Sequence, residues 1–172
     1  WFESKDILKD DKHLAEFEKL HEQMLTDKDK AELVQNYNHM QIMAFIEQKC
    51  FVLTRAESPD GGIVYHGYLC DGETAILQHS CSDFRNGTVN RTSAGRLNKL
   101  LHWEDMKHFK TLGYKIYDWG NTFDEGPDYT NGIDKFKAGF GGVSIKLVSA
   151  FKAASFVGMI ATIARNWKMK RR

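Results

Sequence analysis

The sequence has little cysteine, little proline and little net charge. Its 172 residues include three cysteines and two prolines, and the formal net charge is +1. Three cysteines without a Cys-x-x-Cys spacing disfavour a disulfide scaffold or a zinc site, and favour small buried side chains in a reducing, cytoplasmic setting. A hydrophobic content of 42% predicts a folded globular chain. A net charge near zero creates no overall electrostatic attraction that would support non-specific binding to nucleic acid.

Several signatures are also missing from the sequence. No apolar run reaches the roughly 18 residues of a membrane-spanning helix, and no signal peptide is visible. A Walker loop, a Gly-x-Ser-x-Gly motif and a zinc signature are absent. Among the seven histidines, His66 and His79 fall on neighbouring predicted strands and could meet, but His102 and His108 do not share a helix face. We therefore predict ordinary polar or half-buried histidines, no metal site and no tightly bound cofactor.

Apolar spacing predicts two helices in the first part of the chain. Residues 12 to 25 repeat apolar side chains at steps of three and four, which is typical of an amphipathic helix. Asp27 or Asp29 can cap a second helix that ends near Lys49. The predicted apolar face of this second helix consists of Leu33, Tyr37, Met40 and Ala44.

The periodicity then changes to that of strands. Cys50–Glu57, Ile63–Cys70 and Thr74–Ser82 are predicted strands of an antiparallel meander, joined by turns at Ser58–Gly62 and Asp71–Gly72. Alternation along the third strand predicts one shared face for Ala75, Leu77, His79 and Cys81.

A long central helix is predicted from about Ser93 to Leu112. Thr92 or Ser93 is the expected cap, and Gly113 the left-handed stop. Its apolar residues do not keep to one face, so we expect it to be covered on more than one side. Lys115–Trp119 follows as a strand, parallel to a neighbour because a helix separates it from the meander.

The C-terminal part is predicted as a short helix or irregular segment at residues 129 to 140, a strand at Val143–Phe151 and a final helix from Ala153. The apolar face of the final helix consists of Phe156, Met159, Ile160, Ile163 and Trp167, and four cations follow: Lys168, Lys170, Arg171 and Arg172. Either this face packs on the sheet, or residues 153–172 lie on an anionic membrane or on a second copy. The fold class is α+β with a mostly antiparallel central sheet flanked by helices. We expect a single domain, with a helical part at 1–49, the sheet and central helix at 50–151, and the last helix at 152–172.

Candidate binding residues cluster at the start of the central helix. Helix N-termini bind anions, and Arg91, Gly95, Arg96 and Asn98 could hold a phosphate there. Alternatively, Thr92 and Ser93 only cap the helix and the arginines are solvated.

Two further positions have side chains that could take part in a reaction. Asp118 ends a predicted strand and could hold a lysine or an amine, or it could merely cap a turn. Lys135 and Lys137, beside Phe136 and Phe140, could be held partly desolvated near a reacting carbonyl, or could be surface charges.

Three motifs carry a resemblance to a family. They are Leu101-His102-Trp103, the segment GYKIYDWG from Gly113 to Gly120, and the segment GIDKFKAGFGG from Gly132 to Gly142. Together they resemble the FemAB-like branch of the GNAT-fold acyltransferases, whose pattern is Leu-x-Trp, Gly-x-x-x-x-Asp-x-Gly and Gly-Ile/Leu-x-x-Phe-Lys-x-x-Phe-Gly. The resemblance covers roughly residues 60 to 145.

The resemblance implies a bacterial, cytoplasmic enzyme with a GNAT-like fold. Its reaction would move an acyl or aminoacyl group from acyl-CoA or aminoacyl-tRNA to an amine acceptor. Acyl-CoA would be a co-substrate with its pyrophosphate at Arg91 to Arg96, and Lys137 would lie near the reaction centre. Backbone N–H groups of the third strand, at Ile76 and Gln78, could share the stabilisation of the carbonyl oxygen. Because family members have two such domains, the chain is expected to act alone on another acceptor or to form a homodimer.

The rival interpretation is a non-catalytic module that keeps the fold and binds a protein or membrane partner. A cleft between Thr74–Ser82 and Lys115–Trp119 would favour the enzyme, and a closed pair of strands would favour the module.

Overall fold

The computed structural model of the 172-residue chain describes residues 1–26, 38–83, 91–120, 132–145, 155 and 158–163. The chain divides into two compact units, Trp1–Asn121 and Thr122–Arg172. This division falls inside the segment 50–151, which the sequence predicts as one part. Each unit is described by itself.

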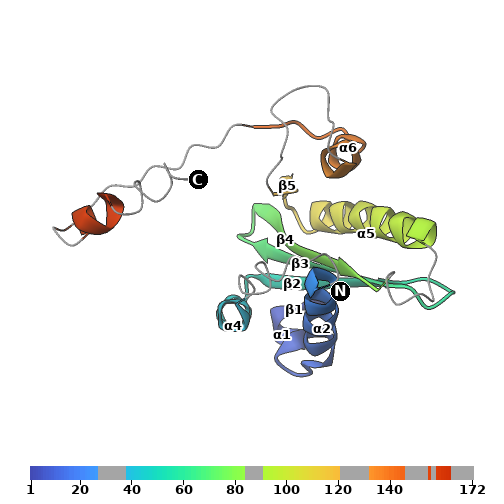
Figure 1. Ribbon diagram of the computed structural model, residues 1–172, viewed down its shortest axis with the longest axis horizontal. Helices are drawn as coiled ribbons and strands as arrows, with labels where there is room; N and C mark the ends of the chain where they lie inside the picture. The colour runs from blue at the N-terminus through green and yellow to red at the C-terminus, as the bar shows by residue number, and fades with distance from the viewer. Residues whose placement is uncertain (27–37, 84–90, 121–131, 146–154, 156–157, 164–172) are drawn as a thin grey trace. The chain divides into compact units, whose positions relative to one another are not determined.

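The first unit is α+β and is built on a mixed five-stranded sheet (Figure 1). Its described strands lie in sequence order, and they are β1 (Phe2–Glu3), β2 (Phe51–Glu57), β3 (Ile63–Cys70), β4 (Thr74–Ser82) and β5 (Ile116–Asp118). All neighbours are antiparallel except β4 and β5, which are parallel. The predicted meander and the parallel strand after the central helix are confirmed. The two-residue strand β1 was not predicted, because so short a segment carries no periodicity.

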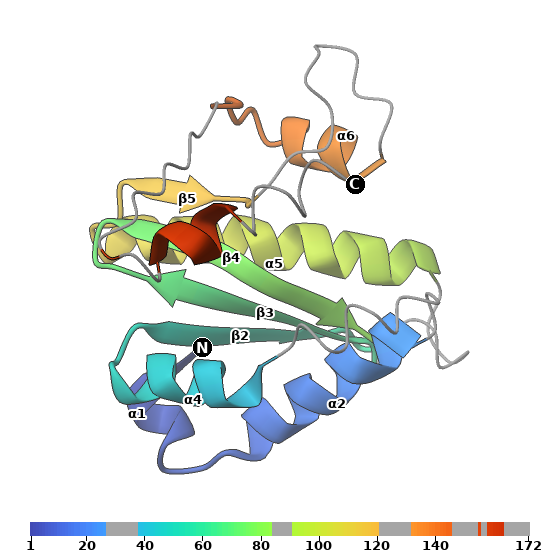
Figure 2. The ribbon, with the colours of Figure 1, turned by 60° about the vertical axis from the view of Figure 1, so that its left-hand side comes forward.

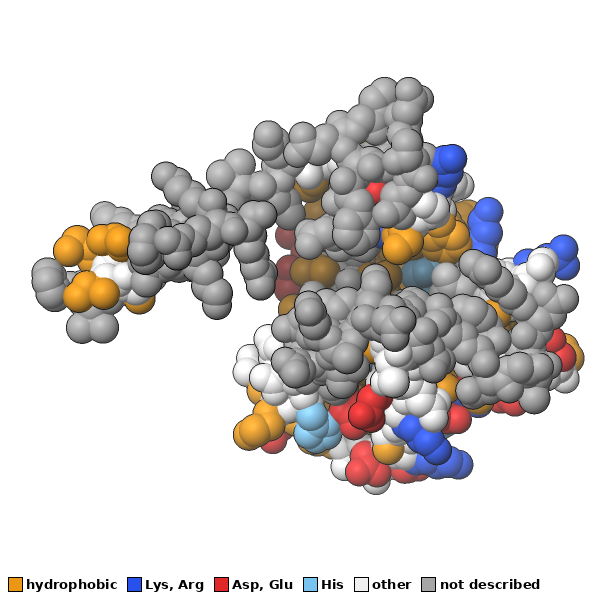
Figure 3. Space-filling view, in the orientation of Figure 1, with side chains coloured by type: hydrophobic (Ala, Val, Ile, Leu, Met, Phe, Trp, Pro, Cys, Tyr) orange, Lys and Arg blue, Asp and Glu red, His pale blue; other side chains and the backbone are white. Residues whose placement is uncertain are grey.

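Helices cover both faces of this sheet, as two views show (Figures 1 and 2). On one face lie α1 (Ser4–Ile7), α2 (Lys12–Thr26) and α4 (His39–Glu47), and on the other lies α5 (Arg91–Thr111). The outer side of the N-terminal helices shows acidic and basic side chains next to one another (Figure 3), as expected for a surface in water. Within the described residues, none of the helices combines the length and the apolar character that crossing a membrane requires.

The N-terminal helices form the larger core with the sheet. It joins buried residues of α1, α2 and α4 to the strands, among them Ile7, Leu14, Phe17, Leu20, Ile42, Ile46, Phe51, Leu53, Tyr65 and Cys81. The amphipathic pattern of residues 12 to 25 is therefore confirmed as α2.

The apolar face predicted for the second helix is wrong in its described part. In α4, Ile42 and Ile46 are buried, whereas Met40 is 80% exposed. Asn38 caps this helix, since its side chain accepts a hydrogen bond from the Gln41 N–H at 3.2 Å. The predicted caps Asp27 and Asp29, and the positions of Leu33 and Tyr37, lie outside the described residues.

A bulge in β4 overturns the predicted common face of that strand. Gly67 of β3 pairs with His79 but Tyr68 pairs with Leu77, so Gln78 has no partner in the register. One extra residue reverses the alternation beyond it. Ala75 and Leu77 consequently pack on the α5 side, whereas Cys81 packs against the N-terminal helices.

The central helix begins earlier than predicted. α5 starts at Arg91, so Thr92 and Ser93 lie inside its first turn and are not its caps. The predicted anion-binding loop from Arg91 to Asn98 is thus the first two turns of the helix. Its far end is as expected, because Gly113 adopts φ +91°, a conformation that glycine tolerates and other residues rarely do.

The second unit contains α6 (Gly132–Ala138), inside the segment 129 to 140 that the sequence predicts as a short helix or irregular. The rings of Phe136 and Phe140 pack edge to face with centroids 5.4 Å apart. Val143 to Ile145 do not form the predicted strand, and the rest of that prediction lies outside the described residues. Residues 158–163 are helical. Phe156, Trp167 and the four terminal cations also lie outside the described residues.

Candidate functional site: a buried polar network

A network of polar side chains lies between the sheet and α5. On the helix, Asn98, His102 and Asp105 follow steps of four and three residues, which places them on one face. The strands contribute the other members, which are Thr54, His66, Tyr68 and Tyr117. Buried polar side chains must be hydrogen-bonded to be tolerated, so each contact here matters for stability.

Asp105 is the centre of the network. Its Oδ2 atom accepts hydrogen bonds from Thr54 Oγ1 at 3.1 Å, from His66 Nδ1 at 2.8 Å and from Tyr68 OH at 2.5 Å. The residue is 0% exposed, and its Oδ1 atom has no hydrogen-bond partner. The carboxylate is therefore held through one oxygen by three donors that come from two strands.

His66 of β3 contacts two residues of α5, Asp105 and Asn98. Its Nε2 atom lies 2.9 Å from Asn98 Oδ1, while its Nδ1 atom faces the carboxylate. The ring therefore bridges two residues of α5 through its two nitrogens. His66 and Asp105 form a fully buried pair in which each partner is hydrogen-bonded.

A chain of hydroxyl groups extends from Asp105 toward the sheet edge. Tyr68 OH lies 2.7 Å from Tyr117 OH, which lies 2.7 Å from His102 Nδ1. Burial raises the pKa of both tyrosines well above the usual value, so both hydroxyls are protonated at neutral pH. Since Tyr68 donates to Asp105, Tyr117 donates to Tyr68. The hydrogen bonds then point in one direction, from His102 through the two tyrosines to Asp105.

His66, His102 and Asp105 also match metal ligands in type, with one ligand atom of each within 4.8 Å of the others. The two imidazole rings, however, are stacked, with centroids 3.9 Å apart and planes 23° apart. An imidazole binds a metal along a lone pair in its ring plane, at about 2.0–2.1 Å for zinc. Two nearly parallel rings at this spacing do not converge on one ion, so the arrangement suits hydrogen bonding and not a metal centre.

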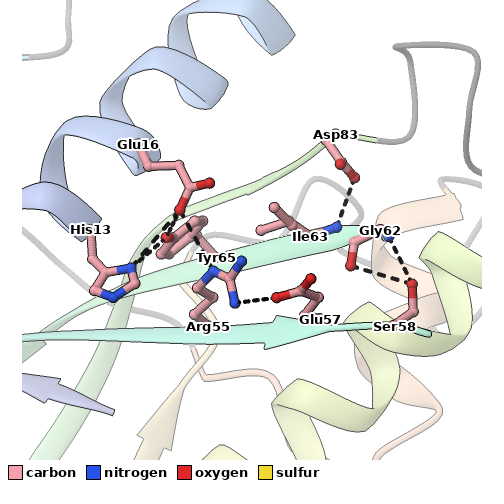
Figure 4. Close-up of polar contacts among 9 residues, drawn as sticks. All are labelled: His13, Glu16, Arg55, Glu57, Ser58, Gly62, Ile63, Tyr65 and Asp83. Atoms are coloured by element: carbon pink, nitrogen blue, oxygen red, sulfur yellow. Dashed lines mark hydrogen bonds and ion pairs between the residues drawn. The ribbon is translucent and has the colours of Figure 1, made fainter. Parts of the chain in front are cut away.

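A second polar cluster lies on the opposite face of the sheet (Figure 4). Tyr65 OH donates to Glu16 of α2 and lies 3.0 Å from His13 Nδ1. Arg55 Nη1 donates to Glu57 at 2.8 Å, and Arg55 Nε lies 3.6 Å from Glu16. Opposite charges alternate through this half-exposed cluster, which holds α2 against the sheet.

The predicted donor-binding residues separate into two groups. The side chain of Asn98 points to the sheet and contacts His66, whereas Gly95 and Arg96 are exposed. Arg91 is the first residue of α5, and its side chain is not among those described. Asn98 therefore belongs to the buried network, apart from the predicted anion site.

The predicted catalytic and strand residues lie as follows. Asp118 ends β5, next to Ile76 in the parallel pair, and its Oδ1 accepts the Gly120 N–H at 2.8 Å. Gln78 is exposed at the bulge. Lys137 lies half-buried in α6 of the second unit, so its predicted role beside the reacting carbonyl stays a prediction.

His66 and His79, which the sequence allowed to meet, lie apart. His79 lies beyond the bulge and faces α2, where its ring contacts His21 at 4.9 Å between centroids. His66 instead meets His102. The spacing of Asn98, His102 and Asp105 was a visible signal of a polar helix face, but the strand residues beneath it could not be identified without the fold.

Comparisons with protein-family models, with curated proteins and with solved structures found no match for this chain.

Proposed function

We propose that this chain is an N-acyltransferase with a GNAT-like fold of the FemAB-like branch. It would move an acyl or aminoacyl group from a phosphate-bearing donor, acyl-CoA or aminoacyl-tRNA, to an amine. The motif resemblance implies this reaction. The order of elements supports it: three antiparallel strands, a long helix and a parallel strand follow one another in the first unit.

The observation that carries the proposal is the short pairing of β4 with β5. The two strands pair only from Thr74 to Ile76, opposite Ile116 to Asp118. From Leu77 to Ser82, β4 is an edge of the described sheet, and the bulge at Gln78 comes two residues after Ile76, the last residue paired with β5. Strand edges and bulges present backbone N–H groups to other molecules. An acyl carbonyl placed there would find donors already fixed in position.

Acyl transfer needs such donors because negative charge develops on the carbonyl oxygen as the amine attacks. Preorganised N–H groups that stabilise this charge are often the largest contribution to catalysis. In this proposal the backbone around Gln78 supplies them. The donor phosphate would lie near Arg91 and Arg96 at the start of α5.

The buried network would serve the attacking amine. An ammonium group must lose a proton before it can attack, and Tyr117 lies half-buried on β5, one residue before its pairing with β4 ends at Asp118. Its hydroxyl connects that position to Asp105 through Tyr68. We assign the network to positioning Tyr117 and to relaying a proton: the Tyr117 oxygen would accept the proton of the amine as its own proton passes to Tyr68 and the Tyr68 proton passes to the Asp105 carboxylate.

A non-catalytic module is the second candidate, and the engagement of Asp118 favours it. The Asp118 carboxylate accepts the Gly120 N–H, as expected for a residue that only shapes a turn. In a module of this kind, the edge of β4 would bind a partner strand.

A transfer assay separates the two candidates. The purified chain is incubated with an amine mixture and either acetyl-CoA or aminoacyl-tRNA, and mass spectrometry is used to search for an acylated amine. The enzyme interpretation predicts an amide product from one donor class, with release of CoA thiol or of free tRNA. Absence of product from both donors, with the chain folded, contradicts the proposal and leaves the binding module.

A further inference from the structure

Cys50 and Cys70 lie opposite each other at one end of the β2–β3 pair. The register pairs Phe51 with Leu69, so the next position outward sets Cys50 against Cys70. The Cys70 N–H donates to the Cys50 carbonyl at 2.7 Å, which continues the antiparallel ladder. Opposed residues in such a hydrogen-bonded position have Cα atoms about 5.5 Å apart. Disulfides span Cα separations of roughly 4.4–6.8 Å, so the backbone already has the required spacing.

The two side chains also start on the same face of the sheet. Cys70 packs in the cluster under α5, together with Val52 of β2. Alternation continued one residue before β2 would set Cys50 on the face of Val52. The Cys50 Sγ atom donates to the Phe45 carbonyl at the end of α4 at 3.3 Å, a contact that it must leave to form a bond. The charge of Cys50 contributes to the raised pKa of Cys70, which indicates that the two thiols are neighbours. Cys70 is buried and Cys50 is half-buried, so a small reagent reaches Cys50 more easily.

The third cysteine is on the other side of the sheet. Cys81 is buried against the N-terminal helices, where its Sγ atom donates to the Phe17 carbonyl at 3.7 Å. The sheet separates it from Cys70. The chain thus contains one pair placed for a bond and one cysteine that serves as an internal control.

We propose that Cys50 and Cys70 are a redox-sensitive pair that forms a reversible intramolecular disulfide. The oxidant is a low-molecular-weight disulfide such as glutathione disulfide. The Cys50 thiolate attacks one of its sulfurs, which forms a mixed disulfide and releases one glutathione thiol. The Cys70 thiolate then attacks the Cys50 sulfur and releases the second thiol. Two protein thiols lose two electrons, the reagent disulfide gains them, and both protons end on glutathione.

The bond would change the contacts beside the β4–β5 pair, where the proposed acyl transfer takes place. The side chain of Cys70 is hydrogen-bonded to Tyr114, which lies between α5 and β5. Cys70 also leads into the turn before β4, where the Glu73 carbonyl accepts the N–H groups of Lys115 and Ile116. Oxidation removes the thiol that Tyr114 contacts and ties this corner to the end of α4. The inference itself depends on the strand register and on the placement of the two thiols, and does not require the proposed acyl transfer.

The test uses the reduced, full-length chain in native buffer with glutathione disulfide. Free thiols are counted after denaturation, and the linked peptides are identified by mass spectrometry after digestion at acidic pH. Two of the three thiols are expected to disappear, with a single Cys50–Cys70 linkage that a dithiol reductant reverses. Burial raises the pKa of Cys70 to about 12, so formation of the bond should accelerate as the pH is raised from about 7 to 9.

Matched variants keep the test decisive. Cys81→Ser should form the same linkage at the same rate, whereas Cys50→Ser and Cys70→Ala should form none. A linkage that includes Cys81 would overturn the proposal, as would a folded wild-type chain that keeps all three thiols or stops at the mixed disulfide.

Discussion

At Asp105, one carboxylate oxygen accepts three hydrogen bonds inside the core. Replacing it by alanine leaves the His66 ring nitrogen and the Tyr68 and Thr54 hydroxyls buried without this partner. A buried polar group that loses its hydrogen-bond partner costs about 1–3 kcal/mol. We therefore expect Asp105→Ala to lower the free energy of unfolding by about 3 kcal/mol or more, measured by urea denaturation followed by circular dichroism.

The neighbouring residue Glu104 is the matched control. It belongs to the same helix, but its contact with Lys107 is an exposed pair at 2.6 Å. Exposed pairs contribute less than about 1 kcal/mol, so Glu104→Ala should change the unfolding free energy by no more than that. Equal losses of unfolding free energy in the two variants would show that the buried hydrogen bonds of Asp105 stabilise the fold no more than an exposed ion pair does.

His79 predicts a pH dependence of stability. Burial lowers its pKa in the folded state, so the unfolded state binds a proton more readily. Its contribution to stability is present above the unfolded pKa of about 6.5 and is lost as the pH falls through the folded value. Between pH 7 and pH 5, the wild-type chain should lose more stability than His79→Gln does, as read from urea midpoints. Parallel losses in both proteins would assign the effect to other groups.

Two glycines test how tightly the elements pack. At Gly67 in β3, an added Cβ would lie 3.0 Å from the Phe51 ring, but at Gly95 in α5 it would meet nothing within 4 Å. Gly67→Ala should therefore destabilise the chain by about 1–3 kcal/mol through overpacking. Gly95→Ala should stabilise it by about 0.5–1 kcal/mol, because alanine favours the helix. Thermal unfolding of the two variants beside the wild type measures both effects, and a gain in stability from Gly67→Ala would contradict the described packing.

At the scale of elements, the sequence predicted what local chemistry determines. The β-branched and aromatic runs, with Asp71–Gly72 between two of them, specify strands and a hairpin turn without any distant contact. The bulge at Gln78 was not predictable, because it arises from how β4 pairs with β3 and leaves no trace in the periodicity of either strand. The same limit applied to α4, where a face assumed to include Met40 is in fact centred on Ile42 and Ile46.

The candidate site was predictable only on its helical side. The steps between Asn98, His102 and Asp105 place polar groups on one face, and that information is local. Their partners come from β2, β3 and β5, which only the tertiary register brings under α5. From the sequence His66 could meet His79 of the next strand, but its actual neighbours are His102 and Asp105.

At the scale of the molecule, the first unit places its polar network and its incomplete strand pair close together. The sheet separates two helical layers, and β5 belongs both to the network, through Tyr117, and to the short parallel pair with β4. A disturbance of the network therefore reaches the edge of β4 through a single strand. This connection is the physical basis for joining the two features in one proposed reaction.

The most direct test of the account is whether the backbone at Gln78 holds the reacting carbonyl. Gln78→Pro removes the N–H at the bulge, and Gln78→Ala keeps it while removing the side chain. With the donor identified by the transfer assay, and with folding checked by circular dichroism, kcat is compared for the two variants and the wild type. Loss of a preorganised donor should lower kcat about 10²–10³-fold in the proline variant, while the alanine variant should stay near the wild-type rate. Equal rates for the proline and alanine variants would contradict the account.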